Sequence, residues 1–276
     1  MLNSCLIILY IMQNEPDYLE INKMLWNEKT RHHTSSAFYK MDEFLKGESS
    51  LNTIELELLG NIKGKSVLHL QCHFGQDSLS LARLGARVTG VDFSDEAINK
   101  AKALNEQLEQ DVRFICSDVY SLPVVLDEHF DIVFTSYGVL GWLPDMKKWA
   151  EIVARFMNPG GTFVIAEFHP VVWMFSSDFR YIQYAYFNKE TIVETTNGTY
   201  ADRDADVKMT EIGWNHDLAE VIQSLISRGL RIDYFQEFDY SPYSCFQNMV
   251  EVAPGRFQIR GMEGKLPLVY AVKAAK

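Results

Sequence analysis

The residues with the clearest chemical potential follow apolar segments of the chain. Asp92 ends the segment 86–91 and lies 17 residues after Gly75. An acidic side chain at the end of such a segment can accept hydrogen bonds from both hydroxyl groups of a ribose. Phe93 follows directly and offers a ring that can stack on a purine. These two residues predict a nucleoside-like ligand.

A polar turn precedes them and reads Val67-Leu-His-Leu-Gln-Cys-His-Phe-Gly75. Gly75 permits close backbone approach or a positive φ. Gln71 and His73 can donate hydrogen bonds to a carboxylate, and the helix expected next offers free N–H groups. If either residue adopts the left-handed conformation, the cost is on the order of 1–2 kcal/mol, which a fold can absorb. The alternative is that His69 and His73 are ordinary hydrogen-bonded histidines.

Short apolar runs alternate with helical patterns from Lys65 onward. The expected strands are 67–70, 86–91, 112–116, 130–135, 162–168, 230–240 and 266–274. The expected helices are 77–84, 94–109, 145–157 and 216–228. This alternation predicts parallel strands with right-handed crossovers, and such sheets bind ligands beyond the carboxyl ends of their strands. The final two strands lack a helix between them and should be antiparallel.

The predicted fold is a doubly wound α/β domain with a seven-stranded, mostly parallel sheet and an antiparallel last strand. The segment after His169 is rich in aromatic residues, and Asn197-Gly198 is a strong hairpin signal. We therefore expect an inserted cap that overhangs the ligand site. The expected units are a helical lid at 13–62, the core at 63–170 and 215–276, and the cap at 171–214. Residues 1–12 are a start-site extension if translation begins at Met12 rather than Met1.

The polar turn resembles the first glycine-rich motif of class I S-adenosylmethionine-dependent methyltransferases, in which an acidic residue precedes Gly-x-Gly-x-Gly. His69 stands at the acidic position, Gln71 and His73 at the first two glycines, and Gly75 at the third. A group of bacterial methyltransferase-like proteins has a similar Leu-His-Leu-Gln-Cys-His-Phe-Gly turn. The resemblance extends from Trp26 to the final strand. It implies a Rossmann-like methyltransferase fold, methyltransferase activity and S-adenosyl-L-methionine as the cofactor.

The resemblance also implies where the cofactor binds. Asp118 would accept from the adenine exocyclic amine and the Val119 N–H would contact the ring, although Asp118 could instead cap a helix. Ser136 and Tyr137 follow the fourth strand, where the methyl group should point. The expected cofactor contacts are His69, Gln71, Cys72, His73, Gly75, Asp92, Phe93, Asp118, Val119, Ser136 and Tyr137.

Methyl transfer is an in-line displacement in which the protein supplies approach geometry and desolvation. A general base is needed only when the acceptor holds a proton. His169, at the end of the fifth strand, is the first candidate, followed by Tyr137 and His33. The residues expected to line the substrate pocket are Trp26, Trp142, Trp173 and His216. Ordinary core packing is the alternative for each tryptophan.

The composition of the chain limits the kinds of substrate and partner that we expect. The formal net charge of −11 repels phosphate backbones, so a small-molecule substrate is favoured over nucleic acid. No cysteine pair has a CxxC spacing, so we expect no metal site. The apolar run 6–12 is too short to span a bilayer and lacks the features of a signal peptide. We expect a cytoplasmic protein without a membrane partner, as a monomer or a homodimer.

Two other functions are open. A nicotinamide-dependent oxidoreductase shares the strand-end acid, but the chain lacks Gly-x-Gly-x-x-Gly and its final strands do not suit that class. A non-catalytic member that binds a ligand or a partner would explain the replaced glycines at Gln71 and His73.

Overall fold

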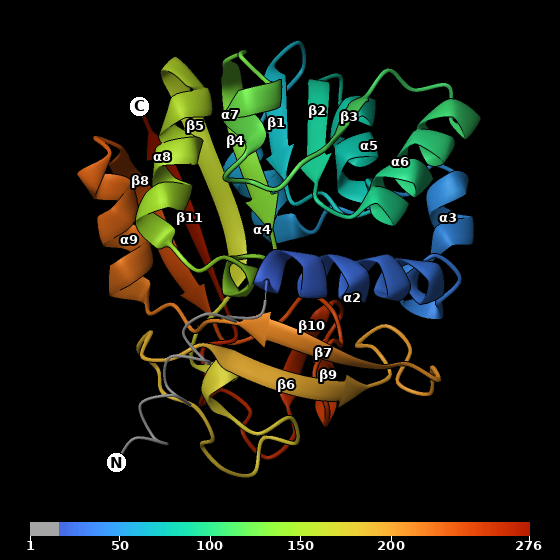
Figure 1. Cartoon of the computed structure of the whole chain (residues 1–276), viewed down its shortest axis with the longest axis vertical. Coiled ribbons are helices and arrows are strands. Elements are labelled where there is room, and N and C mark those ends of the chain that lie inside the picture. Colours follow the sequence, from blue (N-terminus) through green and yellow to red (C-terminus); the bar gives the residue numbers. More distant parts are fainter. Residues whose placement is uncertain (1–16) are drawn as a thin grey trace, which may run out of the picture.

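The computed structural model describes residues 17–276, and a seven-stranded sheet forms its centre (Figure 1). The strand order is β3-β2-β1-β4-β5-β11-β8. These strands are β1 (Ser66–Leu70), β2 (Arg87–Asp92), β3 (Arg113–Cys116), β4 (Phe130–Ser136), β5 (Met157–Phe168), β8 (Arg231–Phe238) and β11 (Val269–Ala275). Strands β1 to β5 pair in parallel, whereas β11 is antiparallel to both β5 and β8. The predicted sheet is confirmed, and the proposed extension at 1–12 lies outside the described residues.

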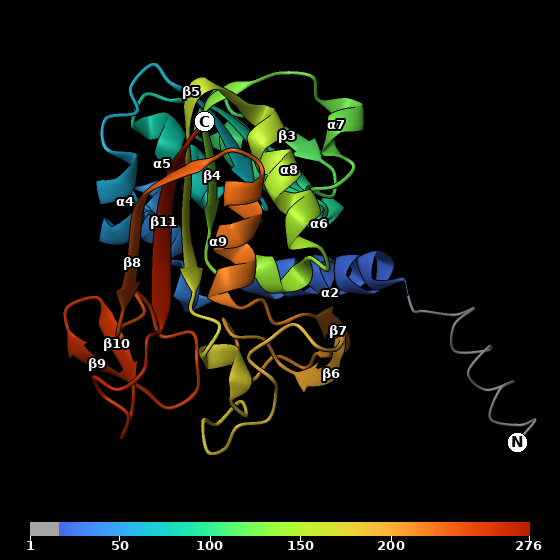
Figure 2. The same cartoon turned by 90° about the vertical axis from the view of Figure 1, so that its left-hand side faces the viewer.

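Helices cover both faces of the sheet, so its central strands are buried on both sides (Figure 2). One face carries α4 (Thr53–Leu59), α5 (Gln76–Arg83) and α6 (Asp95–Gln107). The other face carries α7 (Leu122–Val125), α8 (Met146–Phe156) and α9 (Leu218–Ser227). Val67 of β1 packs into the first core and Leu68 into the second. This double burial explains why the parallel strands are continuous apolar runs rather than alternating ones.

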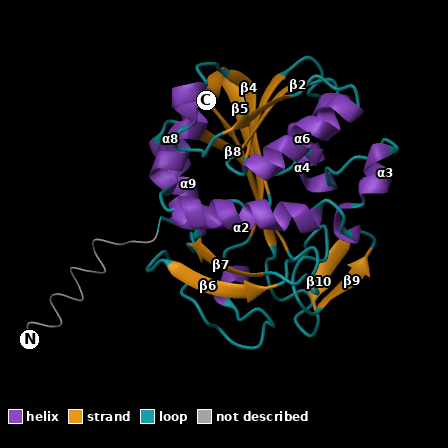
Figure 3. Ribbon diagram, turned by 45° about the vertical axis from the view of Figure 1, so that its right-hand side comes forward, coloured by secondary structure: helices purple, strands orange, loops and turns teal. Residues whose placement is uncertain are grey.

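A long helix, α2 (Tyr18–His33), crosses the carboxyl ends of the strands (Figures 1 and 3). Beyond it lie two small hairpins, β6 (Ile192–Asn197) with β7 (Lys208–Gly213), and β9 (Met249–Ala253) with β10 (Arg256–Ile259). Helix α2 packs against β7 on one side and α6 on the other. The short helices are η1 (Ala37–Tyr39), α3 (Met41–Leu45), η2 (Leu140–Trp142) and η3 (Val172–Met174). These elements thus cover the edge of the sheet formed by the carboxyl ends of the strands, where a ligand is expected.

Three expectations need correction. The lid does not extend to residue 62, because the apolar face of α4 packs against β5 and β11 and belongs to the sheet core. The Asn197-Gly198 pair opens the cap hairpin but makes no two-residue turn, since the loop 198–207 connects β6 to β7. In that loop the Gly198 N–H donates to the Val207 carbonyl at 2.8 Å. The segment between the last two sheet strands also contains the hairpin β9–β10, which the sequence pattern did not reveal.

No helix among residues 17–276 has both the length and the apolar character that a membrane crossing requires.

Gly75 is required by packing as well as by backbone conformation. Its φ is 84°, and a Cβ at this position would lie 2.7 Å from Phe114 and 2.9 Å from the Cβ of Ala101. The turn after β1 therefore lies directly against α6 and β3. Close approach at Gly75 therefore serves the packing of the protein's own core.

We predict that Gly75→Ala destabilises the fold by about 3 kcal/mol, because steric overlap adds to the strain of a positive φ. Gly255→Ala is the matched control, since Gly255 has φ 66° but open space around the new Cβ. That variant should lose only about 1 kcal/mol. Urea unfolding followed by circular dichroism gives both values. Equal losses in the two variants would show that packing against Phe114 plays no part.

Candidate functional site

A cavity of about 830 Å³ lies at the carboxyl ends of the strands, between the sheet, α2 and the hairpin β6–β7. Its walls come from the loops after β1, β2 and β4, from α2, from the cap, and from the segment 242–247. The sheet thus supplies the floor, and segments distant in sequence supply the roof. This is the position at which doubly wound sheets bind ligands.

The loop after β1 keeps a glycine-like backbone although two of its glycine positions are replaced. Gln71 has φ 55° and His73 has φ 51°, and Gly75 follows with φ 84°. Left-handed backbone at a residue with a Cβ costs on the order of 1–2 kcal/mol. The chain therefore retains the loop shape at a cost in strain, and the two side chains occupy space that glycines would leave empty.

Asp92 ties this loop to the next strand. Its Oδ2 accepts from the His73 N–H at 2.8 Å, and its Oδ1 accepts from the Ser94 N–H at 2.9 Å. Burial raises the pKa of Asp92 to about 6, although these N–H groups oppose the shift. A carboxylate has about four acceptor positions, so two remain for a ligand. Asp92 and Phe93 both line the cavity.

The loop after β4 is held by a second buried carboxylate. Glu167 of β5 accepts from the N–H groups of Gly138, Val139 and Leu140, the last two at 2.8 and 3.0 Å. Burial raises the pKa of Glu167, while these N–H donors act in the opposite direction. The Gln71 Nε2 donates to the Val139 carbonyl at 2.9 Å, which joins this loop to the one after β1. The three ligand-facing loops are thus fixed relative to one another.

Three polar atoms near the cavity have no hydrogen-bond partner within the described chain. They are Trp26 Nε1, His69 Nε2 and Gln71 Oε1, and all three residues line the cavity. Buried polar atoms are normally paired, so each calls for water or a ligand. Trp26 Nε1 is a hydrogen-bond donor, Gln71 Oε1 is an acceptor, and His69 Nε2 can be either. Together these atoms are suited to bind a polar organic molecule.

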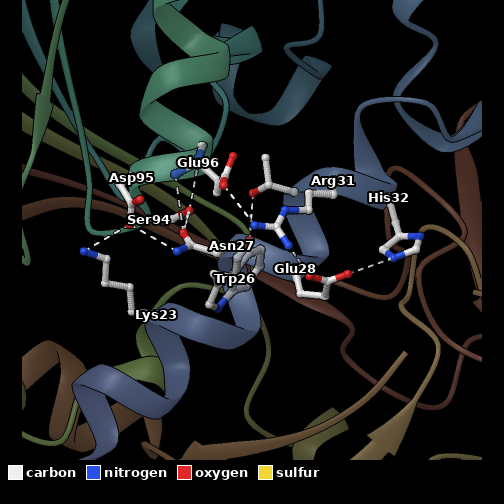
Figure 4. A network of polar contacts seen from close by, with 11 residues as sticks. Lys23, Trp26, Asn27, Glu28, Arg31, His32, Ser94, Asp95 and Glu96 are labelled. Atoms are coloured by element: carbon white, nitrogen blue, oxygen red, sulfur yellow. Dashed lines mark hydrogen bonds and ion pairs between the residues drawn. The ribbon is translucent and has the colours of Figure 1, made fainter. Parts of the chain in front are cut away.

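Polar side chains attach α2 to the start of α6 (Figure 4). The Asn27 Oδ1 accepts from the Ser94 Oγ at 2.7 Å, and its Nδ2 donates to the Asp95 Oδ1 at 3.1 Å. Arg31 pairs with Glu96 at 2.9 Å. Ser94 also caps α6, because its Oγ accepts from the Ala97 N–H. The Asn27 side chain of α2 is therefore bonded to the residue that caps α6, two positions after Asp92.

An aromatic wall faces the cavity from α2. The Trp26 ring lies edge-on to Trp142 and His73, with centroid distances of 5.4 and 5.3 Å. The Lys29 Nζ is 5.1 Å from the centroids of both tryptophan rings and 3.2 Å from the Glu211 Oε2. Its charge is therefore shared between the rings and a carboxylate of the cap.

The predicted site residues fall into two groups. Those that line the cavity are Trp26, His69, Gln71, Cys72, His73, Gly75, Asp92, Phe93, Ser136, Tyr137, Trp142 and Trp173. Those that do not line it are His33, Asp118, Val119, His169 and His216. The structure therefore brings together most of the expected cofactor residues but only one of the three candidates for a general base.

His169 does not reach the cavity, contrary to expectation. Its Nε2 lies 2.8 Å from the Glu237 Oε1, and its Nδ1 accepts from the Val171 N–H at 3.2 Å. Burial lowers its pKa, partly offset by Glu237. The reason is the two-residue period of β5, because Phe168 faces the cavity and His169 therefore faces the other side.

His33 also lies off the cavity wall. It packs against Tyr39, His73 and Tyr200, and its Nδ1 is 3.4 Å from the Tyr39 hydroxyl. Burial, with a smaller effect of the neighbouring His73, lowers its pKa to about 2. A side chain this weakly basic and this enclosed is poorly suited to accept a proton from a substrate.

His216, Asp118 and Val119 have structural partners of their own. The His216 ring is hydrogen bonded to the Leu143 carbonyl at 2.7 Å and lies 2.9 Å from Glu220. Asp118 accepts from the backbone N–H groups of two following residues, and Val119 is buried in the core beneath α7 and α8. His216 thus fixes the return of the cap to the core rather than the substrate pocket.

Sequence reasoning missed several residues on which the site depends. Asn22, Tyr39, Asp77 and Glu167 carry polar contacts in or around the cavity. Glu167 had a visible signal, because it is a lone acid inside the apolar run of the fifth strand. The others lie on segments whose packing against the site cannot be deduced from spacing.

No group of three or more His, Cys, Asp or Glu side chains between residues 17 and 276 is arranged to hold a metal ion.

Comparison with known proteins identifies the class of fold. Residues 67–161 match the family model described as a methyltransferase domain. The structure is similar to an S-adenosylmethionine-dependent methyltransferase from Mesorhizobium loti, with a TM-score of 0.56, 18% identity, and coverage of 84% of this chain and 100% of that chain. The fold is therefore that of Rossmann-like methyltransferases.

Two curated relatives match part of the chain. An uncharacterised methyltransferase of Synechocystis sp. is 34% identical over 131 residues, which cover 47% of this chain and 59% of that protein. A ubiquinone biosynthesis O-methyltransferase of Coxiella burnetii is 37% identical over 100 residues, covering 36% of this chain and 42% of that protein. The chain thus spans about half the length of these relatives.

Asn22 gives a direct test of how α2 is held over the site. Its Nδ2 donates to the Ile212 carbonyl at 2.7 Å and its Oδ1 accepts from the Ile212 N–H at 3.0 Å, and the side chain is 1% exposed. We predict that Asn22→Ala lowers the free energy of opening of α2 by about 2 kcal/mol, because both backbone groups lose their partner. Hydrogen exchange of the α2 amides should accelerate about 30-fold.

The control is Lys23→Ala, which removes a surface ion pair with Asp95 at 3.0 Å. It should change the opening free energy by less than about 0.5 kcal/mol. If both variants leave the exchange of α2 unchanged, the Asn22 contact does not hold the helix.

Proposed function

We propose that this protein transfers a methyl group from S-adenosylmethionine to a small molecule. The observation that carries the proposal is Asp92, a buried carboxylate at the end of β2 that lines the cavity and retains two acceptor positions. The matched methyltransferase domain includes this residue and the loop after β1. Bound S-adenosylmethionine would supply a methyl group on a positively charged sulfur, an excellent leaving group.

The residues present suit an adenosyl sulfonium ligand. Asp92 would accept from the ribose hydroxyls, and Phe93 would contact the adenine ring. The unpaired Gln71 Oε1 can accept a hydrogen bond from the ammonium group at the methionyl end. Asp118 and Val119, outside the cavity wall, are proposed to contact adenine only at its outer edge. A cavity of about 830 Å³ has room for such a ligand together with an acceptor.

The chain's own contribution is orientation and exclusion of water. Helix α2 and the hairpin β6–β7 lie over the carboxyl ends of the strands, so they limit the access of solvent to the site (Figure 3). Ser136 and Tyr137 lie at the end of β4 on the wall between the Asp92 side and the cap side of the cavity. Tyr137 donates its hydroxyl proton to Glu55 at 2.7 Å, and burial raises the pKa of that hydroxyl further above its ordinary value. Tyr137 is therefore better suited to position an acceptor than to remove its proton.

We predict that Asp92→Asn weakens binding of S-adenosylhomocysteine at least about 30-fold, since an amide cannot replace a carboxylate that accepts both hydroxyl groups. Isothermal titration calorimetry measures the affinity, and circular dichroism verifies that the variant is folded. Asp111→Asn, at an exposed position, removes the same charge and should bind as the wild type does. Unchanged affinity in folded Asp92→Asn would remove Asp92 from the proposed ribose site.

The raised pKa of Asp92 predicts a pH dependence. The ribose hydroxyls donate to the deprotonated carboxylate, so affinity should be constant above pH 7 and fall about tenfold per pH unit below about pH 6. His69 and His73, with pKa values lowered to about 3 by burial, stay neutral across this range and add no slope. Calorimetry between pH 5 and pH 8 tests this. A profile that is flat or that rises toward low pH would contradict the role of Asp92.

A further inference from the structure

A large part of the cavity wall consists of aromatic rings. They come from the segments after α2, from the ends of β4 and β5, from the cap, and from the segment 242–247. The rings are Phe38, Tyr39, Phe44, Tyr137, Phe168, Phe175, Phe179, Tyr200, Tyr243 and Phe246. We call this part the aromatic chamber. Its ring faces can bind an aromatic body, and they also attract cations.

Two carboxylates, Asp77 and Glu55, lie beside one another at the floor of this chamber. Asp77 lines the cavity and is half-buried, and it accepts from the Ser50 Oγ at 2.6 Å and the Ser136 Oγ at 3.2 Å. Glu55 is fully buried behind it and accepts from the Tyr137 hydroxyl. Burial raises the pKa of both carboxyl groups, and Asp77 raises that of Glu55 further. When both carboxyl groups are ionised, their negative charges repel each other in an environment with little water.

No cation in the described part of the chain neutralises this pair. Among residues 17–276 neither Asp77 nor Glu55 forms an ion pair. The basic side chains around the cavity are engaged or exposed. Lys29 pairs with Glu211, Arg203 donates to the Phe246 carbonyl of the segment 242–247, and Lys40 is exposed. A buried charge without a counterion is costly, so a positively charged ligand would bind favourably here.

An unpaired histidine nitrogen adds a second, independent indication of a ligand. His69 is 1% exposed and lines the same cavity. Its Nδ1 is 2.8 Å from the hydroxyl of Ser78, the residue after Asp77, and its Nε2 has no partner. Because burial keeps His69 neutral, the unpaired nitrogen can exchange a hydrogen bond with a ligand without repelling a cation.

We propose that the aromatic chamber binds a methyl acceptor that carries a protonated amine on an aromatic body. The ammonium group is held by Asp77, in the first turn of α5 beside Ser136, and it anchors the molecule while the methyl group is transferred to another, nucleophilic atom of the same molecule. Glu55, which is buried and does not line the cavity, adds a second negative charge near the ammonium group. The aromatic rings enclose the apolar part of the ligand. Anionic acceptors are excluded by the two carboxylates. The inference depends on the proposed methyl transfer for the role of the amine, but its binding test does not need turnover.

The test uses three probes of nearly equal shape, with the protein saturated by S-adenosylhomocysteine. Tyramine carries an ammonium group, 2-(4-hydroxyphenyl)ethanol a hydroxyl group, and 3-(4-hydroxyphenyl)propionate a carboxylate. We expect tyramine to bind at least about tenfold more tightly than the alcohol, and the carboxylate to bind most weakly. Calorimetry on the wild-type protein gives this order without any variant. Equal binding of tyramine and the alcohol, stronger binding of the carboxylate, or no binding of any probe at millimolar concentrations overturns the inference.

A variant of Asp77 tests whether this side chain binds the ammonium group. Asp77→Asn should weaken tyramine at least about tenfold and leave the alcohol within about threefold, whereas the exposed control Asp111→Asn should change neither. Affinity for S-adenosylhomocysteine is measured in the same samples. If Asp77→Asn weakens that ligand as strongly as it weakens tyramine, Asp77 belongs to the cofactor site and the inference fails.

The two proposals fail in distinguishable ways. If the wild-type protein does not bind S-adenosylhomocysteine, the proposed function fails. If it binds that ligand but shows no preference for the amine, only the amine inference fails.

Discussion

The hydrogen bond from the His73 N–H to Asp92 is the contact on which the site depends. It joins the loop after β1 to the end of β2, one strand away from the point between β1 and β4 at which the strand order reverses. Glu167 performs a comparable task for the loop after β4, so two buried acids fix the loops that face the cavity. Both acids accept from backbone N–H groups, which repays part of the cost of burying them.

The loop after β1 shows why the replaced glycines do not imply loss of the site. Gln71 and His73 adopt the left-handed backbone that glycine favours, and the contacts of their side chains account for the retained strain. Gln71 bonds to Val139, and His73 packs against Trp26. Strained backbone of this kind persists only where the surroundings determine it, and it is concentrated at functional sites. The lid helix and the loop thus depend on each other.

The sequence predicted the sheet well because the evidence for it is local. Apolar runs, helix caps such as Ser94 and the order of elements each depend on neighbouring residues. The positions of Asp92 and of the turn could be predicted for the same reason, since both lie directly at strand ends. The sequence wrongly placed His169 at the cavity. The side of the sheet toward which a residue at a strand end points depends on the strand register, and it is opposite for the neighbours Phe168 and His169. The sequence could not reveal Asp77 or Asn22, whose roles arise from contacts with segments far apart in the chain.

The central claim is that Asp92 and the loop after β1 hold one adenosyl group. A crystal structure of the protein with S-adenosylhomocysteine tests it most directly. The account predicts both ribose hydroxyls within hydrogen-bonding distance of the Asp92 carboxylate, with the amino acid end of the ligand beside Gln71 and His73. A ligand bound elsewhere, or a ribose that faces away from Asp92, would contradict it.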